Sequence, residues 1–195
     1  MQTDRFPPRV VVGITGASGV LYGVRALELL GQLGVETHLV FTKAARATLA
    51  QETDLGVADV RALACHVYSE HDLGAAISSG SFPTDGMLVA PCSVKSLSGI
   101  ANSYDDNLLV RAADVTLKER RPLVLLVRET PLHAGHLRLM AQACDAGATI
   151  MPPVPAFYTK PGSVEELITQ TAGRALDALR LSHPATARWS ATSRR

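Results

Sequence analysis

A glycine-rich turn after the first apolar segment is the earliest place where this sequence could do chemistry. Residues 13–19 read GITGASG, and their small side chains let the backbone approach a phosphate group. A helix that starts after such a turn offers free backbone N–H groups and the positive end of its dipole, which favour an anion. Glycine-rich turns also form for packing alone, so the turn by itself leaves both interpretations open.

The spacing of the glycines distinguishes between phosphate ligands. A dinucleotide fingerprint requires G-x-G-x-x-G and an acidic residue at the end of the second strand. Here Gly16 and Gly19 have the spacing G-x-x-G, and the second apolar segment ends in Phe41 and Thr42. The P-loop pattern G-x-x-x-x-G-K-[ST] does not occur in the sequence. We therefore expect a mononucleotide such as FMN to bind, and NAD not to bind.

A second polar turn follows the third apolar segment. Residues 90–96 read APCSVKS, so Ser93, Lys95 and Ser96 would bring hydroxyls and backbone N–H groups to another helix start. An ordinary helix cap explains the same residues equally well. Cys92 would need an adjacent base to act as a nucleophile, and the sequence shows none, so we interpret it as a buried structural thiol.

Basic residues gather in the second half of the chain. Arg111 and Lys118 are seven residues apart and therefore share one face of the expected helix, and Arg128 follows the fourth expected strand. Cations without an acidic counter-face suit a phosphate or diphosphate ligand. For Arg120 and Arg121 we favour a solvated helix face.

Two other patterns resemble metal sites only weakly. His133 and His136 have the spacing i, i+3 but no clear third ligand, and Asp105-Asp106 is not part of a DDxxD motif. We interpret the two aspartates as a turn. The sequence therefore predicts no metal site and chemistry that does not depend on a metal.

The elements that must position these residues alternate between apolar strands and helices. Strands are expected at residues 9–15, 37–41, 65–68, 86–90, 123–127 and 148–151, and helices at 20–33, 43–50, from 94, 108–119, 132–146 and 164–179. Such alternation predicts βαβ units with a parallel sheet covered by helices on both faces. We expect a three-layer α/β/α sandwich with its ligand at the carboxyl ends of the strands, near the topological switch point.

Length and composition limit the class of protein. A chain of 195 residues fits one domain, here residues 1–195, with an ordered core over about 10–180 and a flexible tail at 183–195. Hydrophobic residues at 47% and charged residues at 19% exclude a disordered chain. A net charge of +1 argues against nucleic acid as a partner, and no apolar run is long enough to cross a membrane. Three cysteines without a CxxC motif favour a reducing, cytoplasmic location.

Taken together, these segments closely resemble the UbiX-type flavin prenyltransferases. The resemblance runs from residue 10 to about 179, with the motifs in order: GITGASGVLYGVRALELL, ETHLVFTKAA, QETD, ISSGSFPTDGMLVAPCS, NLLVRAADVTLKERRPLVLLVRETPLHAGHLRLM and MPPVPAFY. It implies a Rossmann-like flavoprotein that assembles as a homododecamer. It also implies metal-independent transfer of the dimethylallyl group of dimethylallyl phosphate to N5 and then C6 of reduced FMN. The product, prenylated FMN, would serve UbiD-type decarboxylases.

The resemblance also implies roles for individual residues. Matching motifs place FMN against Gly16, Ala17, Ser18, Thr42, Ser93, Val94, Lys95, Ser96 and Arg128. They place dimethylallyl phosphate against Arg111, Lys118, Tyr158 and Arg174, with Arg111 reaching a site across a subunit boundary. Ser18, Glu52 and Glu129 are the implied residues for proton handling.

Three positions depart from the common pattern of that family. Thr42 stands where serine is common and Ser96 where threonine is common, so both keep the hydroxyl group. Leu73 occupies a position where some members carry tryptophan, which would change the wall of the allyl pocket. Two alternative functions stay open at this point: a flavin-dependent cysteine decarboxylase of the phosphopantothenoylcysteine type, and a non-catalytic flavin carrier or accessory subunit of a decarboxylase.

Overall fold

A computed structural model describes residues 7–189 of the chain. Its six strands form a parallel sheet in the order β3-β2-β1-β4-β5-β6. The strands are β1 (Arg9–Ile14), β2 (Glu36–Phe41), β3 (His66–Tyr68), β4 (Gly86–Cys92), β5 (Leu123–Val127) and β6 (Thr149–Ile150). The helices are α1 (Val20–Gln32), α2 (Lys43–Glu52), α3 (Val57–Ala62), α4 (Val94–Ala101), α5 (Leu108–Lys118), α6 (Ala134–Asp145) and α7 (Val164–Ala178).

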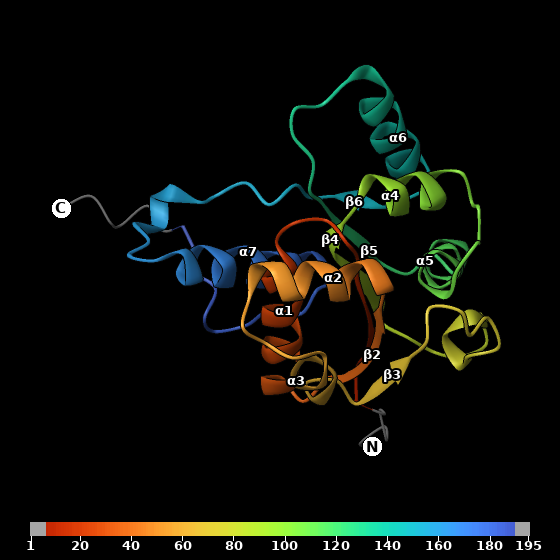
Figure 1. The fold of residues 1–195 in the computed structure, drawn as a ribbon, viewed down its shortest axis with the longest axis horizontal. Helices are drawn as coiled ribbons and strands as arrows, with labels where there is room; N and C mark the ends of the chain where they lie inside the picture. Colours follow the sequence, from red (N-terminus) through yellow and green to blue (C-terminus); the bar gives the residue numbers. More distant parts are fainter. Residues whose placement is uncertain (1–6, 190–195) are drawn as a thin grey trace, which may run out of the picture.

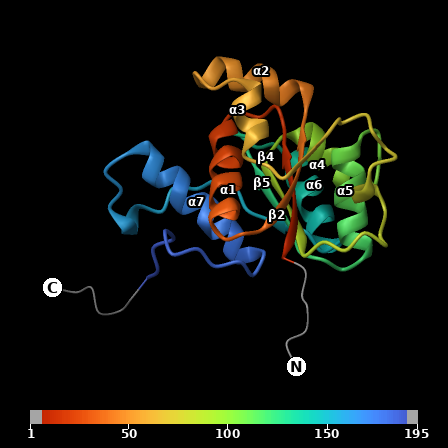
Figure 2. The same cartoon turned by 90° about the horizontal axis from the view of Figure 1, so that it is seen from below.

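Helices cover both faces of this sheet. Figure 2 shows α1 and α7 on one side of the strands and α4, α5 and α6 on the other. Each side has its own apolar core: Leu27, Leu30 and Leu176 belong to the first, and Leu109 and Met87 to the second. The expected three-layer α/β/α sandwich is therefore confirmed.

The local sequence explains where the first strand and helix begin and end. All residues of β1 except Arg9 are buried, as in a parallel strand covered on both faces. Gly19 precedes α1 with a φ of 95°, and Gly34 follows it with a φ of 68°. Both values lie in the left-handed region, which glycine adopts without the steric cost of a side chain.

The strand order creates the crevice that the sequence predicts. The chain moves outward from β1 through β2 to β3, and β4 then returns to the other side of β1. The connections that follow β1 and β4 therefore run in opposite directions along the sheet. In such sheets, ligands bind at this point, outside the carboxyl ends of the two strands. Figure 1 shows α2 and α4 starting near these strand ends.

The clearest differences from the expected elements are at three places. The short helix α3 was not expected; it begins after Gly56, whose backbone N–H donates to the Asp59 side chain at 2.7 Å. Strand β4 continues through Pro91 to Cys92, where the pairing with β5 shifts register. Helix α6 begins at Ala134, two residues later than expected, because His133 caps its start.

The end of the described chain folds back onto α7. The backbone N–H of Ala187 donates to the side-chain oxygen of Gln170 at 2.8 Å, and the two terminal guanidinium nitrogens of Arg188 contact the carboxylate of Asp177. His183 and Thr186 are buried. Residues 183–189 thus pack where a flexible tail was expected, and the rest of that tail, 190–195, lies outside the described residues. Among residues 7–189, no helix is long and apolar enough to cross a membrane.

Candidate functional site

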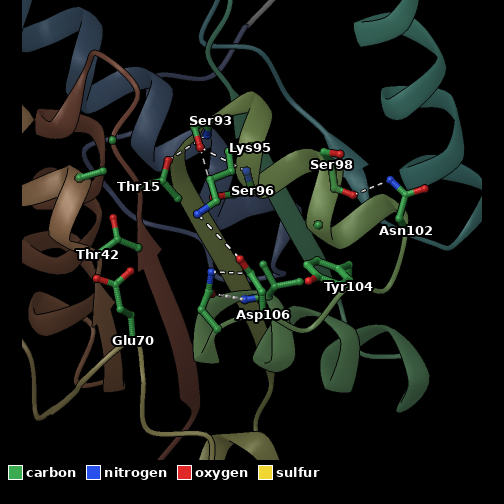
Figure 3. Close-up of a pocket in the computed structure, with 15 residues that line it drawn as sticks. Thr15, Thr42, Glu70, Ser93, Lys95, Ser96, Ser98, Asn102, Tyr104 and Asp106 are labelled. Carbon is green, nitrogen blue, oxygen red and sulfur yellow. Dashed lines mark hydrogen bonds and ion pairs between the residues drawn. The ribbon is translucent and has the colours of Figure 1, made fainter.

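A pocket of about 530 Å³ opens at the carboxyl ends of β1, β2 and β4. Its wall contains five residues expected to contact FMN, namely Gly16, Thr42, Ser93, Lys95 and Ser96. Figure 3 shows Thr42 on one side of this space and the residues at the start of α4 on the other. The pocket therefore lies at the switch point, where the sequence predicts the ligand.

Thr15 fixes the two central strands to each other at the floor of the pocket. Its hydroxyl donates to the carbonyl oxygen of Pro91 at 2.7 Å and accepts from the backbone N–H of Ser93 at 2.9 Å. The residue is 1% exposed, so both bonds lie away from water. Sequence reasoning did not assign Thr15 to the site, although a hydroxyl residue at the end of a buried strand is a usable signal.

Hydroxyl residues begin the two helices that flank the pocket. Ser93 accepts a hydrogen bond from the backbone N–H of Ser96 at 3.3 Å, and its hydroxyl donates to the Ser96 hydroxyl at 3.2 Å. Thr42 caps α2 in the same way, accepting from the Ala45 N–H at 3.1 Å. The predicted cap at Ser93 is confirmed. The positive ends of both helix dipoles therefore face a pocket that is rich in hydroxyl groups.

The far wall of the pocket is made of polar residues that sequence reasoning missed. They are Glu70, Ser98, Asn102, Tyr104, Asp106 and Asn107. Glu70 accepts from the backbone N–H of Lys43 at 2.7 Å, and Asp106 lies 3.8 Å from the ammonium group of Lys95. Apart from Ser98, which lies on α4, they come from loops or loop ends whose position depends on the tertiary fold, so no local sequence pattern indicated them.

The start of α1 holds a carboxylate of the protein itself. Glu52 accepts from the backbone N–H of Gly19 at 2.8 Å and from that of Val20 at 3.1 Å. The expectation that these amides are free for a ligand phosphate is therefore wrong. Gly16 allows the close approach of this turn to α2, because a Cβ atom there would lie 2.5 Å from the Cβ of Ala44.

Ser18, Glu52 and Arg128 form a group beside this helix start. Burial opposes the ionisation of Glu52, but hydrogen bonds from the Ser18 side chain and from two backbone amides, with the charge of Arg128, outweigh it. The pKa of Glu52 is consequently below its usual value. Ser18 and Glu52, two of the residues expected to handle protons, thus lie near Arg128, which is an expected flavin contact.

Glu129 and Arg128 follow β5, where the chain leaves the sheet. The backbone N–H of Arg128 donates to the Cys92 carbonyl at 3.0 Å, which joins the ends of β5 and β4. Glu129 is exposed, and its carboxylate accepts from the backbone N–H of Thr130 at 3.0 Å. Both side chains therefore belong to the carboxyl edge of the sheet, as expected. The lining of the pocket, as described for residues 7–189, does not include four of the expected flavin contacts, namely Ala17, Ser18, Val94 and Arg128.

The cations of α5 have partners of their own. Arg111 contacts the carboxylates of Asp105 at 3.0 Å and Asp114 at 3.1 Å, and Lys118 pairs with Glu119. We expected these cations to have no acidic residues opposite them, and for this helix that expectation is wrong.

Arg121 also differs from its expected role. It donates to the carbonyl oxygens of Phe82 and Gly80, each at 2.9 Å, so it holds a loop rather than forming a solvated face.

Arg174 lies on α7, in the other helical layer, and Tyr158 lies in the segment that precedes this helix. Arg174 contacts Asp177 at 2.8 Å, and the Tyr158 hydroxyl accepts from the Gln170 side chain at 3.5 Å. Figure 2 shows α5 and α7 on opposite sides of the sheet. One protomer therefore does not bring together the four residues expected to grip the allyl phosphate.

Cys92 and the histidine pair have structural surroundings. Cys92 is fully buried, which raises its pKa to about 12 and keeps the thiol protonated, as the structural interpretation requires. His133 accepts from the backbone N–H of Gly135 at 3.0 Å, and its ring packs on His136 with centroids 3.6 Å apart. His133 therefore caps the start of α6, and His136 in the first turn of that helix packs against it.

Comparison with known proteins identifies the family. The model of the Flavoprotein family matches residues 2–169. Flavin prenyltransferase UbiX of Escherichia coli strain K12 is 59% identical over 184 residues, covering 93% of this chain and 97% of that protein.

Solved structures agree with this result. The crystal structure of AnUbiX (PadA1) in complex with FMN and dimethylallyl pyrophosphate has a TM-score of 0.94 and 51% identity, covering 95% of this chain and 98% of that one. A dodecameric FMN-dependent UbiX-like decarboxylase from Escherichia coli O157:H7 has a TM-score of 0.91 and 46% identity, covering 93% and 99%. With its crevice at the β1–β4 switch point, the chain belongs to the Flavoprotein family and, within it, to the UbiX-type flavin prenyltransferases.

Proposed function

We propose that this protein is a flavin prenyltransferase that joins the dimethylallyl group of dimethylallyl phosphate to N5 and C6 of reduced FMN. Its product, prenylated FMN, is made for UbiD-type decarboxylases. The observation that carries the proposal is the match in sequence and fold to UbiX proteins over nearly the whole chain, together with a pocket at the switch point. We further propose that residues 1–195 form a single domain that works in the cytoplasm as a homododecamer.

The residues around the pocket fit a flavin mononucleotide. Thr42, Ser93 and Ser96 offer hydroxyl groups at two helix starts, and Lys95 offers a positive charge beside them. Such donors bind phosphate and ribityl oxygens. Gly16 lines the pocket, and its lack of a side chain lets this turn pack closely against Ala44 of α2. Ala17, Ser18, Val94 and Arg128 complete the proposed flavin contacts.

Reduced FMN supplies the nucleophilic N5 and C6 atoms when it is bound. The protein's own contribution is to stabilise the phosphate that leaves as the allylic C–O bond breaks. Arginine, lysine and tyrosine donors placed against that phosphate stabilise its developing negative charge and can take the usual role of magnesium. We assign this role to Arg111, Lys118, Tyr158 and Arg174. Because α5 and α7 lie on opposite sides of one protomer, neighbouring subunits would have to complete the set.

Formation of the new ring requires a proton to leave C6, and a carboxylate or the departing phosphate must accept it. Glu52 is held ionised by its hydrogen bonds, so we assign it the task of orienting the Ser18 hydroxyl. Glu129 is exposed and accepts from one backbone amide of its own loop. It therefore suits direct proton transfer better than Glu52.

Mass spectrometry of the released flavin tests this function. The pure protein is incubated without oxygen with reduced FMN and dimethylallyl phosphate, and the flavin is then extracted. We expect a flavin that carries one additional five-carbon unit. A flavin that leaves unchanged would contradict the transferase and would favour the carrier alternative. In a separate assay with oxidised FMN and a cysteine substrate, loss of carbon dioxide from that substrate would favour the decarboxylase alternative.

A further inference from the structure

Glu36, His38 and His66 lie together at the amino-terminal ends of β2 and β3, opposite the strand ends that form the pocket. Glu36 and His38 are two residues apart on β2, so their side chains leave the same face of the sheet. His38 and His66 are direct partners in the parallel pairing of β2 with β3. The backbone therefore aligns all three side chains.

The distances between the donor atoms suit a single metal ion. The Glu36 Oε1 atom lies 3.0 Å from the Nε2 of His38 and 3.5 Å from the Nε2 of His66. One donor atom from each of the three residues falls within 4.8 Å of the others. Ligands bound at about 2.1 Å in a tetrahedron around zinc lie about 3.4 Å apart. The rings of His38 and His66 are stacked, with centroids 4.7 Å apart and an interplanar angle of 19°, so the His66 imidazole must rotate before both histidines can direct a nitrogen at one ion. That movement is available because the His66 side chain is 52% exposed.

Surrounding residues hold two of the donors in place. The Tyr68 hydroxyl lies 2.9 Å from the Nδ1 of His38, the ring nitrogen that faces away from Glu36. The Nε of Arg9 donates to the Oε2 of Glu36 at 3.0 Å, leaving Oε1 turned toward the imidazoles. Metal-binding histidines and carboxylates usually have such partners on their remaining polar atoms.

We propose that Glu36, His38 and His66 form a binding site for a divalent transition-metal ion such as zinc. Two imidazole nitrogens and one carboxylate oxygen are a common zinc ligand set, and the exposed side at His66 leaves a position for water. A bound ion would fasten the three-residue edge strand β3 to β2. The site lies at the opposite end of the strands from the flavin pocket, so it is separate from prenyl transfer.

The charge of Arg9 sets the expected strength of this site. Its guanidinium group contacts the same carboxylate and repels a dication. We therefore expect micromolar binding, weaker than that of structural zinc sites closed by four protein ligands. Without metal, the same residues form the hydrogen-bonded cluster described above, so folding does not depend on the ion.

Calorimetric titration with zinc chloride tests the proposal on the full chain after chelator treatment and dialysis. We expect one ion per protomer and at least a tenfold loss of affinity in His66→Ala. His71→Ala is the matched control, because it removes another exposed histidine five residues away, and it should bind zinc like the wild type. Zinc should also raise the melting temperature of the wild type, but not that of His66→Ala.

Cobalt provides a second readout of the same site. Tetrahedral cobalt(II) bound to the wild type should absorb visible light, and Glu36→Gln should lose this band while its circular dichroism shows a folded chain. Failure of the wild type to bind zinc would overturn the proposal. Equal zinc affinity in wild type and His66→Ala, or loss of binding in His136→Gln instead, would overturn it too, since the latter places the ion at the α6 histidine pair.

Discussion

Glu52 has two connected roles at the scale of single residues. Its carboxylate satisfies two backbone N–H groups at the start of α1 and holds the hydroxyl of Ser18. A negative charge at this position also interacts favourably with the positive end of the helix dipole. The residue therefore links the stability of α1 to the orientation of a group beside the flavin pocket.

Glu52→Gln should reduce stability at neutral pH by about 1 kcal/mol, the usual contribution of a carboxylate at a helix start. The pKa of Glu52 is lowered on folding, so its contribution is present above the unfolded value of 4.5 and is lost as pH falls through the lower folded value. Urea unfolding at pH 7 and in acid measures this difference. An equal gap between wild type and variant at both pH values would contradict the assignment.

Arg174→Ala separates substrate binding from flavin binding. A charged hydrogen bond to phosphate contributes about 1.5–3 kcal/mol, so kcat/KM for dimethylallyl phosphate should fall by roughly ten- to more than a hundredfold. The affinity for FMN, measured by flavin fluorescence, should stay nearly unchanged. Loss of FMN binding with normal turnover at saturating flavin would show that this arginine does not hold the substrate phosphate.

At the scale of elements, α7 and the segment that follows it act as one unit. Asp177 accepts hydrogen bonds from Arg174 at 2.8 Å and from Arg188 at 2.6 Å, while Gln170 contacts both Tyr158 and Ala187. The aromatic rings of Tyr158 and Trp189 meet edge to face with centroids 5.6 Å apart. The segment after α7 therefore contacts Asp177 and Gln170, the same side chains that contact Arg174 and Tyr158, and these two residues are proposed to bind the allyl phosphate.

Asp177→Asn should weaken the positioning of Arg174 without removing the arginine itself. We expect KM for dimethylallyl phosphate to rise several-fold, with a smaller change in kcat and unchanged FMN affinity. Steady-state kinetics with Arg188→Ala as a companion variant would show which ion pair matters. If Asp177→Asn behaves like the wild type while Arg174→Ala is impaired, the carboxylate has no positioning role.

The sequence predicted these elements where local signals and tertiary structure agree. Buried strands such as β1 and β5, and helices bounded by Ser93 or Gly34, have apolar periodicity and a clear cap. The short helix α3 lacked such a periodic stripe, since Val60 is its one buried residue. Partners that are distant in sequence, such as Glu52 on Gly19, cannot be read from local patterns. The same limit explains why the far wall of the pocket was missed.

At the scale of the whole molecule, exposed apolar residues indicate that the protomer is not the functional unit. Val154, Phe157 and Val164 are 72–73% exposed, and Tyr158 and Trp189 are also well exposed. Figure 1 shows the segment before α7 extending away from the sheet. Exposed apolar surface of this kind is typical of a protein–protein interface. It lies beside the proposed substrate residues, which supports a site completed by neighbouring subunits.

Phe157→Glu should therefore break the assembly while leaving the protomer folded. A charge at a site that is buried between subunits is costly, whereas the same change on a free surface alters stability by less than about 0.5 kcal/mol. Analytical ultracentrifugation should show smaller species, and circular dichroism an unchanged fold. Activity should fall together with assembly. An intact dodecamer with full activity would show that this segment is not part of the interface.

Turnover in excess EDTA tests the central claim most directly. If protein cations take the place of magnesium at the leaving phosphate, chelation should leave the rate of prenylated FMN formation unchanged, even as it strips any ion from Glu36, His38 and His66. The measurement follows the flavin absorbance in a single turnover and identifies the product by mass. Full activity in EDTA is the predicted result. Activity that disappears with the chelator and returns with magnesium would contradict the account.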